Sequence, residues 1–337
     1  DLPAGLKFDV FTGEISGTAL EISANTTYTI TARNSGGFDT TTVTIEVVDQ
    51  LPTVAYSPDD LQLTNNTASG DLPLTPSLTG FGAITSWELN NTNLPSGILF
   101  ASNNGTFYGT PTELWPTTAY KVWANNTGGS TVAYLNITVV DEIPTDFTYS
   151  LDDLQLTNNT ASGDLPLTPS LTGNGAITSW ELNNTNLPPG ISFGSNNGTF
   201  YGTPTELWPT TAYKVWANNT GGSVEAYLNI TVVDEVPSLT YLPDNLTLTK
   251  NQPSTDLPLA PTLTGSGTIM SWEISPDLPA GLNFGQSNGT IWGIATVLQT
   301  SPVTYTVWAN NSGGSSSATV NITINDEAPG PFEYIPE

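Results

Sequence analysis

The chain has 337 residues, of which 31 are acidic and only 5 basic, and its net charge is −26. Such a surface repels phosphate groups, so nucleic acid and anionic membrane surfaces are poor partners. Cysteine and histidine are absent, which excludes disulfides, zinc sites built on Cys or His, Ser-His-Asp triads and cysteine nucleophiles.

One motif recurs about every 92 residues. Its four copies read LPAGLKFDVFTGEISGT (2–18), LPSGILFASNNGTFYGT (94–110), LPPGISFGSNNGTFYGT (187–203) and LPAGLNFGQSNGTIWGI (278–294). A second signature follows each copy and reads YTITARNSGG (28–37), YKVWANNTGG (120–129 and 213–222) and YTVWANNSGG (305–314). Because solenoid units typically have some 20–50 residues, this longer period indicates whole small domains, each able to bury its own core.

In chain order, the repeats predict the rear part of a domain, three complete domains and the first strand of another: residues 1–52, 53–144, 145–237, 238–329 and 330–337. One explanation of the two incomplete domains is donor-strand exchange, in which residues 332–335 of one subunit complete the first domain of another and so build a filament. It supplies a single strand, however, so we favour a longer continuous polypeptide.

Within a repeat, short alternating runs are separated by Gly, Pro and Asn turns, which is typical of an all-β fold. In the repeat 145–237, strands are predicted at 147–149 with 154–157, then at 165–171, 177–182, 191–193, 199–201, 212–218 and 226–233. This pattern fits a two-sheet β-sandwich of immunoglobulin type, with Trp180 in the core and Tyr213 at a tyrosine corner. Trp87 with Tyr120 and Trp272 with Tyr305 repeat the arrangement.

The run LP-x-G-(I/L)-x-F, followed by N-G-T-(F/I)-x-G and by Y-x-V-x-A with a Gly-Gly turn, resembles the immunoglobulin-like repeats of large archaeal and bacterial surface proteins. These are related to dystroglycan-type cadherin-like domains. The resemblance covers nearly the whole chain and implies tandem β-sandwiches used for adhesion or scaffolding, without catalytic residues. Members of the family often carry Asp near Asn125, Asn218 and Asn310, and Asn at these positions argues against a metal role there.

Asparagine glycosylation is predicted from N-x-S/T sequons, which are the acceptor signal for N-linked sugars. Alternation along the strands places Asn125 and Asn136 on the outer face, and Asn104 and Asn197 fall in Asn-Gly turns. The alternative is that Asn- and Thr-rich turns generate sequons freely and duplication multiplies them. The fifteen sequons are at Asn25, Asn65, Asn90, Asn104, Asn125, Asn136, Asn158, Asn183, Asn197, Asn218, Asn229, Asn245, Asn288, Asn310 and Asn321.

The same alternation makes Trp123, Trp216 and Trp308 face outward, two residues before a sequon. Three interpretations are open: a shelf for the first sugar residues, a contact with a neighbouring chain, or a tryptophan covered by a loop such as the one carrying Trp115.

The repeats meet at acidic, proline-containing linkers without a Gly-Ser spacer, which predicts a semi-rigid rod. Asp141 and Glu142 could meet Asp152 and Asp153 of the next domain and hold calcium, which needs about six to eight oxygen ligands. Solvated carboxylates are the favoured interpretation, because the acidic pattern is incomplete at other linkers. The linkers read VVDQLP (47–52), VVDEIP (139–144), VVDEVP (232–237) and INDEAP (324–329).

We therefore expect a structural or adhesive cell-surface protein, extracellular and archaeal, without enzymatic activity or a cofactor other than possible calcium. Its expected partners are copies of itself or further repeats of the same chain, together with N-linked glycans. The sequence contains no apolar run of about 18 residues that would span a membrane. The alternatives are a carbohydrate-binding adhesin module that uses the exposed tryptophans, and a carbohydrate-active enzyme. Near-identical repeats disfavour the enzyme because they offer no distinctive cleft.

Overall fold

A computed structural model describes residues 1–80 and 82–331. The described residues form strands, turns and loops, and no helix among them could cross a membrane. The all-β prediction is confirmed. The first strand predicted for 330–337 lies almost entirely outside the described residues.

The domain that begins at Thr53 contains eight strands. A four-stranded sheet has the order β6-β12-β11-β8, in which β6 runs parallel to β12 and the other neighbours are antiparallel. Two short pairs, β5-β7 and β9-β10, form the opposite layer, linked by a bridge between Leu74 and Phe107. The strands are β5 (Thr53–Ala55), β6 (Asp60–Thr64), β7 (Ser77–Thr79), β8 (Ser86–Leu89), β9 (Ile98–Ala101), β10 (Thr106–Gly109), β11 (Trp115–Asn126) and β12 (Gly129–Val140).

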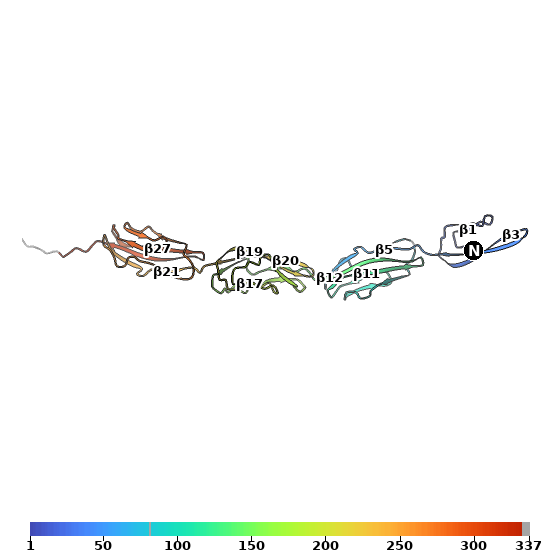
Figure 1. The fold of residues 1–337 in the computed structure, drawn as a ribbon, viewed down its shortest axis with the longest axis horizontal. Helices are drawn as coiled ribbons and strands as arrows, with labels where there is room; N and C mark the ends of the chain where they lie inside the picture. Colours follow the sequence, from blue (N-terminus) through green and yellow to red (C-terminus); the bar gives the residue numbers. More distant parts are fainter. Residues whose placement is uncertain (81, 332–337) are drawn as a thin grey trace, which may run out of the picture. The chain divides into compact units, whose positions relative to one another are not determined.

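The next two domains repeat this topology, with four-stranded sheets of order β14-β20-β19-β16 and β22-β28-β27-β24. Figure 1 labels β17, β19 and β20 in the third domain, and β21 and β27 in the fourth. In the third domain the strands are β13 (Thr145–Thr148), β14 (Asp153–Thr157), β15 (Ser170–Thr172), β16 (Ser179–Leu182), β17 (Ile191–Phe193), β18 (Phe200–Gly202), β19 (Trp208–Asn219) and β20 (Gly222–Val233). In the fourth they are β21 (Ser238–Thr240), β22 (Asn245–Thr249), β23 (Thr262–Thr264), β24 (Ser271–Ser275), β25 (Leu282–Phe284), β26 (Ile291–Gly293), β27 (Gln299–Asn311) and β28 (Gly314–Asn325).

Residues 1–52 form two hairpins, β1 (Leu6–Phe8) with β2 (Ile15–Gly17) and β3 (Ser23–Asn34) with β4 (Gly37–Val47). These correspond to the last four strands of a complete domain. Tyr28 and Ile30 remain half-buried, whereas the equivalent Tyr120 and Val122 are fully buried. The core positions of these two hairpins are therefore less buried than their counterparts in the second domain.

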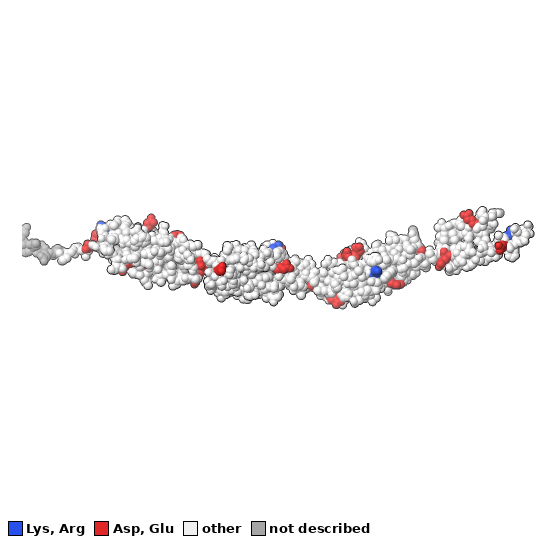
Figure 2. All heavy atoms as spheres, in the orientation of Figure 1, with Lys and Arg blue, Asp and Glu red and all other residues white. Residues whose placement is uncertain are grey.

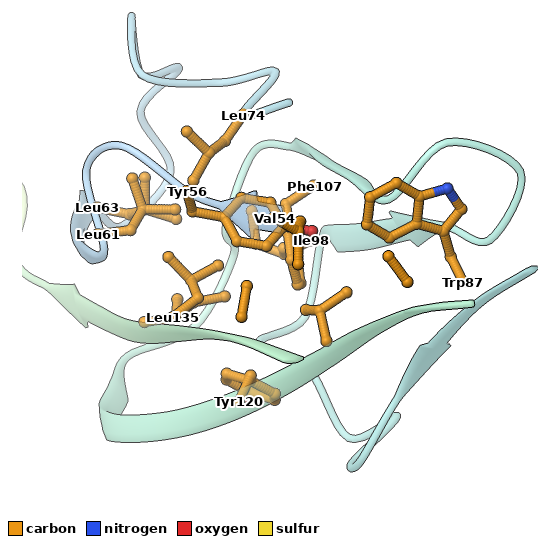
Figure 3. Packing of buried hydrophobic residues seen from close by; sticks show 14 of the residues in the cluster. Val54, Tyr56, Leu61, Leu63, Leu74, Trp87, Ile98, Phe107, Tyr120 and Leu135 are labelled. Carbon is orange, nitrogen blue, oxygen red and sulfur yellow. The ribbon is translucent and has the colours of Figure 1, made fainter. Parts of the chain in front are cut away.

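Each complete domain has its own hydrophobic core between its two layers. Alternation along β11 and β12 turns Tyr120, Val122 and Ala124, with Leu135 and Ile137, toward that core, which confirms the predicted strand register. Figure 3 shows side chains from both layers meeting in the second domain, with Phe107, Ile98 and Val54 in the middle of the cluster.

The prediction of a core tryptophan is confirmed in the second and fourth domains, whereas the tryptophan of the third domain is only partly buried. Trp87 and Trp272 are 7% and 6% exposed and belong to the cores. Trp180 packs against its core, 5.5 Å from the Phe147 ring, but stays half-buried. Trp123, Trp216 and Trp308 lie outside all three cores and are half-buried rather than widely exposed.

The predicted tyrosine corner is wrong in its details. Tyr213 lies well inside β19, which begins at Trp208, and its hydroxyl donates to the Asn186 carbonyl, 2.8 Å away. A tyrosine corner instead bonds the backbone a few residues upstream. Tyr120 makes the equivalent bond to the Asn93 carbonyl at 2.9 Å. The hydroxyl therefore ties the central strand to the loop carrying the LP-x-G motif, which is a non-local contact that spacing alone could not indicate.

One predicted strand is largely absent. Of the run 165–171, only Ser170 and Leu171 fall within β15, and Leu167 makes an isolated bridge to Phe200. Pro166 and Pro169 interrupt the run, and proline lacks the N–H group that a ladder needs. The prediction also made β19 and β20 too short.

A second set of buried tyrosines is expected to make the complete domains sensitive to alkali. The hydroxyls of Tyr56, Tyr149 and Tyr241 donate to the carbonyls of Gly105, Gly198 and Gly289, and burial raises the pKa of each hydroxyl well above its ordinary value. Because the unfolded chain loses these protons first, the stabilisation is complete below pH ~10 and is lost as the pH rises toward the folded pKa.

We expect the complete domains to unfold progressively above pH ~10, as measured by circular dichroism and by amide exchange resolved by domain. In Tyr56→Phe the pH dependence of the second domain should flatten, while the third and fourth domains serve as internal references. An unchanged alkaline midpoint for the second domain would contradict this assignment.

Candidate functional site

The candidate functional surface is the outer face of the four-stranded sheets. It carries Trp123, Trp216 and Trp308 and, among the predicted sequons, Asn125, Asn136, Asn218, Asn229, Asn310 and Asn321. In the second domain, Trp123 lies opposite Glu88 on β8 and Val132 on β12. Trp115, the residue expected in a covering loop, instead begins β11 and packs against the core. Trp115 therefore does not lie in a loop that covers Trp123.

The third domain presents a charged aromatic cluster at the equivalent place. The Lys214 ammonium lies 4.9 Å from the Trp216 ring centroid and 5.5 Å from that of Tyr227, and it forms an ion pair with Glu225. The hydrogen bond to Glu225 raises the pKa of Lys214, and the same bond lowers the pKa of Glu225. Tyr227 is 59% exposed. In the second domain Lys121 lies 5.8 Å from the Tyr134 ring.

The sheet-face asparagines are held by the same network in all three complete domains. Asn125 Nδ2 donates to Ser86 Oγ and Glu88 Oε1, both at 2.9 Å. Asn218 donates to Ser179 and Glu181, and Asn310 to Ser271 and Glu273, at 2.9–3.0 Å. The network comes from the recurring sequences S-W-E on one strand and W-A-N on its neighbour, in which the outer residues flank an inward-facing one.

A second row of asparagines on the outer face donates only one side-chain hydrogen bond per residue, whereas Asn125 and its counterparts donate two. Asn229 Nδ2 donates to Asp153 Oδ1 at 2.7 Å, Asn136 donates to Asp60, and Asn321 donates to Asn245 Oδ1 at 3.0 Å. All three asparagines are half-buried. They are therefore partly engaged by the neighbouring parallel strand.

The hairpin-tip sequons have a different geometry. Asn104 is exposed, and its Oδ1 accepts the backbone N–H of Thr106 at 3.1 Å. Gly105 between them has a φ of 74°, and a Cβ there would lie 2.6 Å from the Trp87 ring. The tips at Asn197 and Asn288 repeat this arrangement. The N-G-T sequence is thus needed by the fold, whether or not it carries sugar.

The remaining sequons lie in turns and at strand ends. Asn90 and Asn183 are exposed, and their Oδ1 atoms accept the backbone N–H of Lys121 and Lys214 at 2.8 Å. Asn65 and Asn158 are half-buried, with their Oδ1 atoms enclosed and unpartnered. Asn25 and Asn245 are exposed on β3 and β22.

The four calcium candidates do not form a site. Asp153 binds the Asn229 amide, and Asp141 binds Thr220. Within residues 1–80 and 82–331, no group of three or more acidic side chains is placed to hold a metal ion. Figure 2 shows small acidic patches on a mostly uncharged face.

The interpretation of the linker aspartates as solvated is wrong for Asp141 and Asp234, which are 7% and 8% exposed. The Asp141 N–H donates to Thr220 Oγ1 at 2.8 Å, and the Thr220 hydroxyl donates back to Asp141 Oδ2 at 2.9 Å. Asn219 Nδ2 donates to the carbonyl of Glu142 at 2.6 Å. Sequence reasoning missed this role, although an Asp in each linker and an N-(T/S)-G-G turn in each domain accompany one another.

The linkers at 47–52 and 232–237 are bound in the same way. Asp49 pairs with Thr127, and Asp234 pairs with Ser312, each through two hydrogen bonds of 2.8–2.9 Å. Asn126 and Asn311 donate to the carbonyl of the residue that follows the aspartate. Each of these three linkers is thus held by the hairpin turn between the last two strands of the domain that follows it.

Replacing Gly221 with alanine should release its linker. The added Cβ would lie 2.0 Å from the Asp141 carbonyl oxygen, so the linker must shift and lose hydrogen bonds worth roughly 0.5–1.5 kcal/mol each. We expect faster amide exchange at 141–144 and new protease cleavage there. Gly163→Ala is the matched control, since no atom lies within 4 Å of its added Cβ. Equal protection of the linker in both variants would contradict the role of this turn.

Comparison with known proteins places the chain in a family. The family model described as "Putative Ig domain" matches residues 1–48, 52–140, 146–233 and 236–325. The chain belongs to this family. This match confirms the resemblance to immunoglobulin-like repeats that the sequence motifs indicated. The matched segments also follow the repeats seen in the sequence.

Among curated proteins, this Ig-repeat chain is similar to the "Serine-rich adhesin for platelets" of Staphylococcus aureus, with 34% identity over 131 residues. The match covers 39% of this chain and 6% of that protein, or 9% for the protein of strain MRSA252. The chain thus spans a small part of the length of the relatives it matches. Since these relatives are bacterial, they give no support to the expected archaeal origin.

Two solved structures are similar to the Ig-repeat chain at low sequence identity. The N-terminal eight Ig domains of Down Syndrome Cell Adhesion Molecule are 16% identical, with a TM-score of 0.37, over 95% of this chain and 43% of that one. Drosophila N-cadherin EC1-3 is 14% identical, with a TM-score of 0.35, over 80% of this chain and 98% of that one.

Proposed function

We propose that this chain is a segment of an extracellular cell-surface protein with a structural and adhesive, non-enzymatic role. The observation that carries the proposal is the repetition of one Ig-like domain, with the linkers at Asp49, Asp141 and Asp234 each bound to the domain that follows. A series of such domains suits the display of a binding surface away from a cell. The name of the staphylococcal relative, an adhesin, supports the same role.

N-linked sugars and assembly with copies of itself belong to the same proposal. Only 11% of the residues are charged, well under the usual share of about a quarter, so sugars would supply the solvation that charges provide elsewhere. An extracellular filament or an S-layer-associated fibre would use the repeated outer faces for contacts between chains.

The surface role is tested on the intact source organism. Antibodies against the chain should label unbroken cells, and protease added outside should remove the label. Deletion of the repeats from the native protein should reduce attachment of the cells to surfaces or to one another. Label that appears only after lysis would refute the proposal.

A second candidate function is carbohydrate binding by the outer face. The Lys214, Trp216 and Tyr227 cluster favours it, because an aromatic face beside a polar group is a suitable contact for a sugar ring. Retention of the native protein on polysaccharide columns, lost in Trp216→Ala but kept in Trp308→Ala, would support this function. Equal retention of both variants would count against the cluster.

A further inference from the structure

We infer that the sugars are carried by the loop sequons and that the sheet-face sequons stay unmodified. The loop acceptors are Asn90, Asn104, Asn183, Asn197 and Asn288, whereas the excluded sheet-face residues are Asn125, Asn218 and Asn310. The inference rests on the proposed N-glycosylation of this surface protein. It narrows the expectation from strand alternation, which also placed glycans on the sheet face.

The chemistry of attachment gives the criterion. The side-chain Nδ2 forms a bond to C1 of an activated sugar, the C1–O bond to a phosphate leaving group of the lipid-linked donor breaks, and one amide proton passes to a base. A free asparagine amide has two N–H hydrogens, so a glycosylated one keeps a single hydrogen. An asparagine that uses both in the folded protein cannot carry a sugar without losing a bond.

The sheet-face asparagines fail this criterion in all three complete domains. Asn125 uses its two N–H groups on Ser86 and Glu88, and its counterparts repeat both bonds. The side chains are half-buried, and the strand of Asn125 is paired on both sides, with β8 and with β12. A sugar would therefore displace a carboxylate contact in the middle of a sheet.

The loop asparagines meet the criterion. Their Oδ1 atoms accept backbone N–H groups, from Lys121 for Asn90 and from Thr106 for Asn104. This contact fixes the amide while its Nδ2 donates to no other described residue. All five loop asparagines are exposed. A sugar can be added there without loss of any hydrogen bond that holds the domain.

The two loop groups differ in the third residue of the sequon. Thr92 and Thr185 are exposed, so the sequons at Asn90 and Asn183 can be read in the folded domain. Thr106 and Thr199 are buried, so modification of the hairpin tips must precede closure of the β9-β10 and β17-β18 hairpins. Asn136, Asn229 and Asn321 each donate one amide N–H group to a neighbouring strand. We therefore expect sugar on an intermediate fraction of these three asparagines.

Occupancy is measured by electron-transfer glycopeptide mass spectrometry on protein purified from its native source. We expect sugar on most copies of the five loop asparagines and on few or no copies of the three sheet-face ones. The variant Thr92→Ala, expressed in the same organism, should lower the intact mass by one glycan. It leaves the Asn90 and Lys121 contact in place, so it should fold as the native protein does.

Equal or higher occupancy at Asn125, Asn218 and Asn310 would overturn this inference and leave the proposed glycosylation standing. Protein without sugar at any sequon would overturn both. The surface location would still be decided separately by labelling of unbroken cells.

Discussion

Replacing Trp87 with alanine is expected to destabilise the second domain by about 3–5 kcal/mol, the usual cost of truncating a buried aromatic side chain. Trp87 is 7% exposed, belongs to the core and packs against Gly105 of the hairpin tip. Since a domain of this kind has a total stability of about 5–15 kcal/mol, much of its folded population is at risk.

Hydrogen exchange resolved by domain measures the effect, because the third and fourth domains act as references within one molecule. Trp123→Ala is the matched control. It removes the same side chain from a half-buried position outside the core, so its effect should be clearly smaller. If the two variants lose equal stability, the outer-face tryptophans are as important to the fold as the core ones.

Replacing Gly105 with alanine should be nearly as damaging, although it adds only one methyl group. The residue has a φ of 74°, and the new Cβ would lie 2.6 Å from the Trp87 ring. Backbone strain of this kind costs about 1–3 kcal/mol, and overpacking costs roughly the same again. The Gly105 carbonyl also accepts the buried Tyr56 hydroxyl, so a shift of the backbone weakens that bond as well.

The expected readout is a lower Tm for the second domain, by roughly 4–8 °C for each kcal/mol lost. Gly70→Ala is the control in the same domain, because nothing lies within 4 Å of its added Cβ and its φ is not positive. A Tm for Gly105→Ala that matches the control would show that the hairpin tip tolerates a side chain.

The N-G-T sequence of the hairpin tip therefore has two separate roles. The glycine and the carbonyl are needed by the core, while the asparagine amide remains at the surface. Loss of the sugar acceptor, for example in Asn104→Asp, should therefore leave the core contacts of Gly105 intact. Loss of the glycine should damage the domain in unglycosylated protein too.

The sequence by itself determined the domain period, the all-β class and the register of the long strands. These are local or periodic signals: alternation along β11 places Tyr120 and Val122 inside and Trp123 outside wherever one face is buried. The Asn-Gly turns at 104–105 and 197–198 were equally readable, because the turn itself requires a positive φ at glycine.

Only the tertiary structure decided which polar side chains are free. Asn125 and Asn104 are both in sequons. Asn125, however, donates both of its amide N–H groups to Ser86 and Glu88, which lie 39 and 37 residues away in the sequence. The sequence predicted a solvated carboxylate at Asp141, but in the structure the turn at Thr220, 79 residues later, covers it and forms hydrogen bonds with it. Such hydrogen bonds join residues that are distant in sequence. Their geometry depends on packing between strands, and no short pattern of residues encodes it.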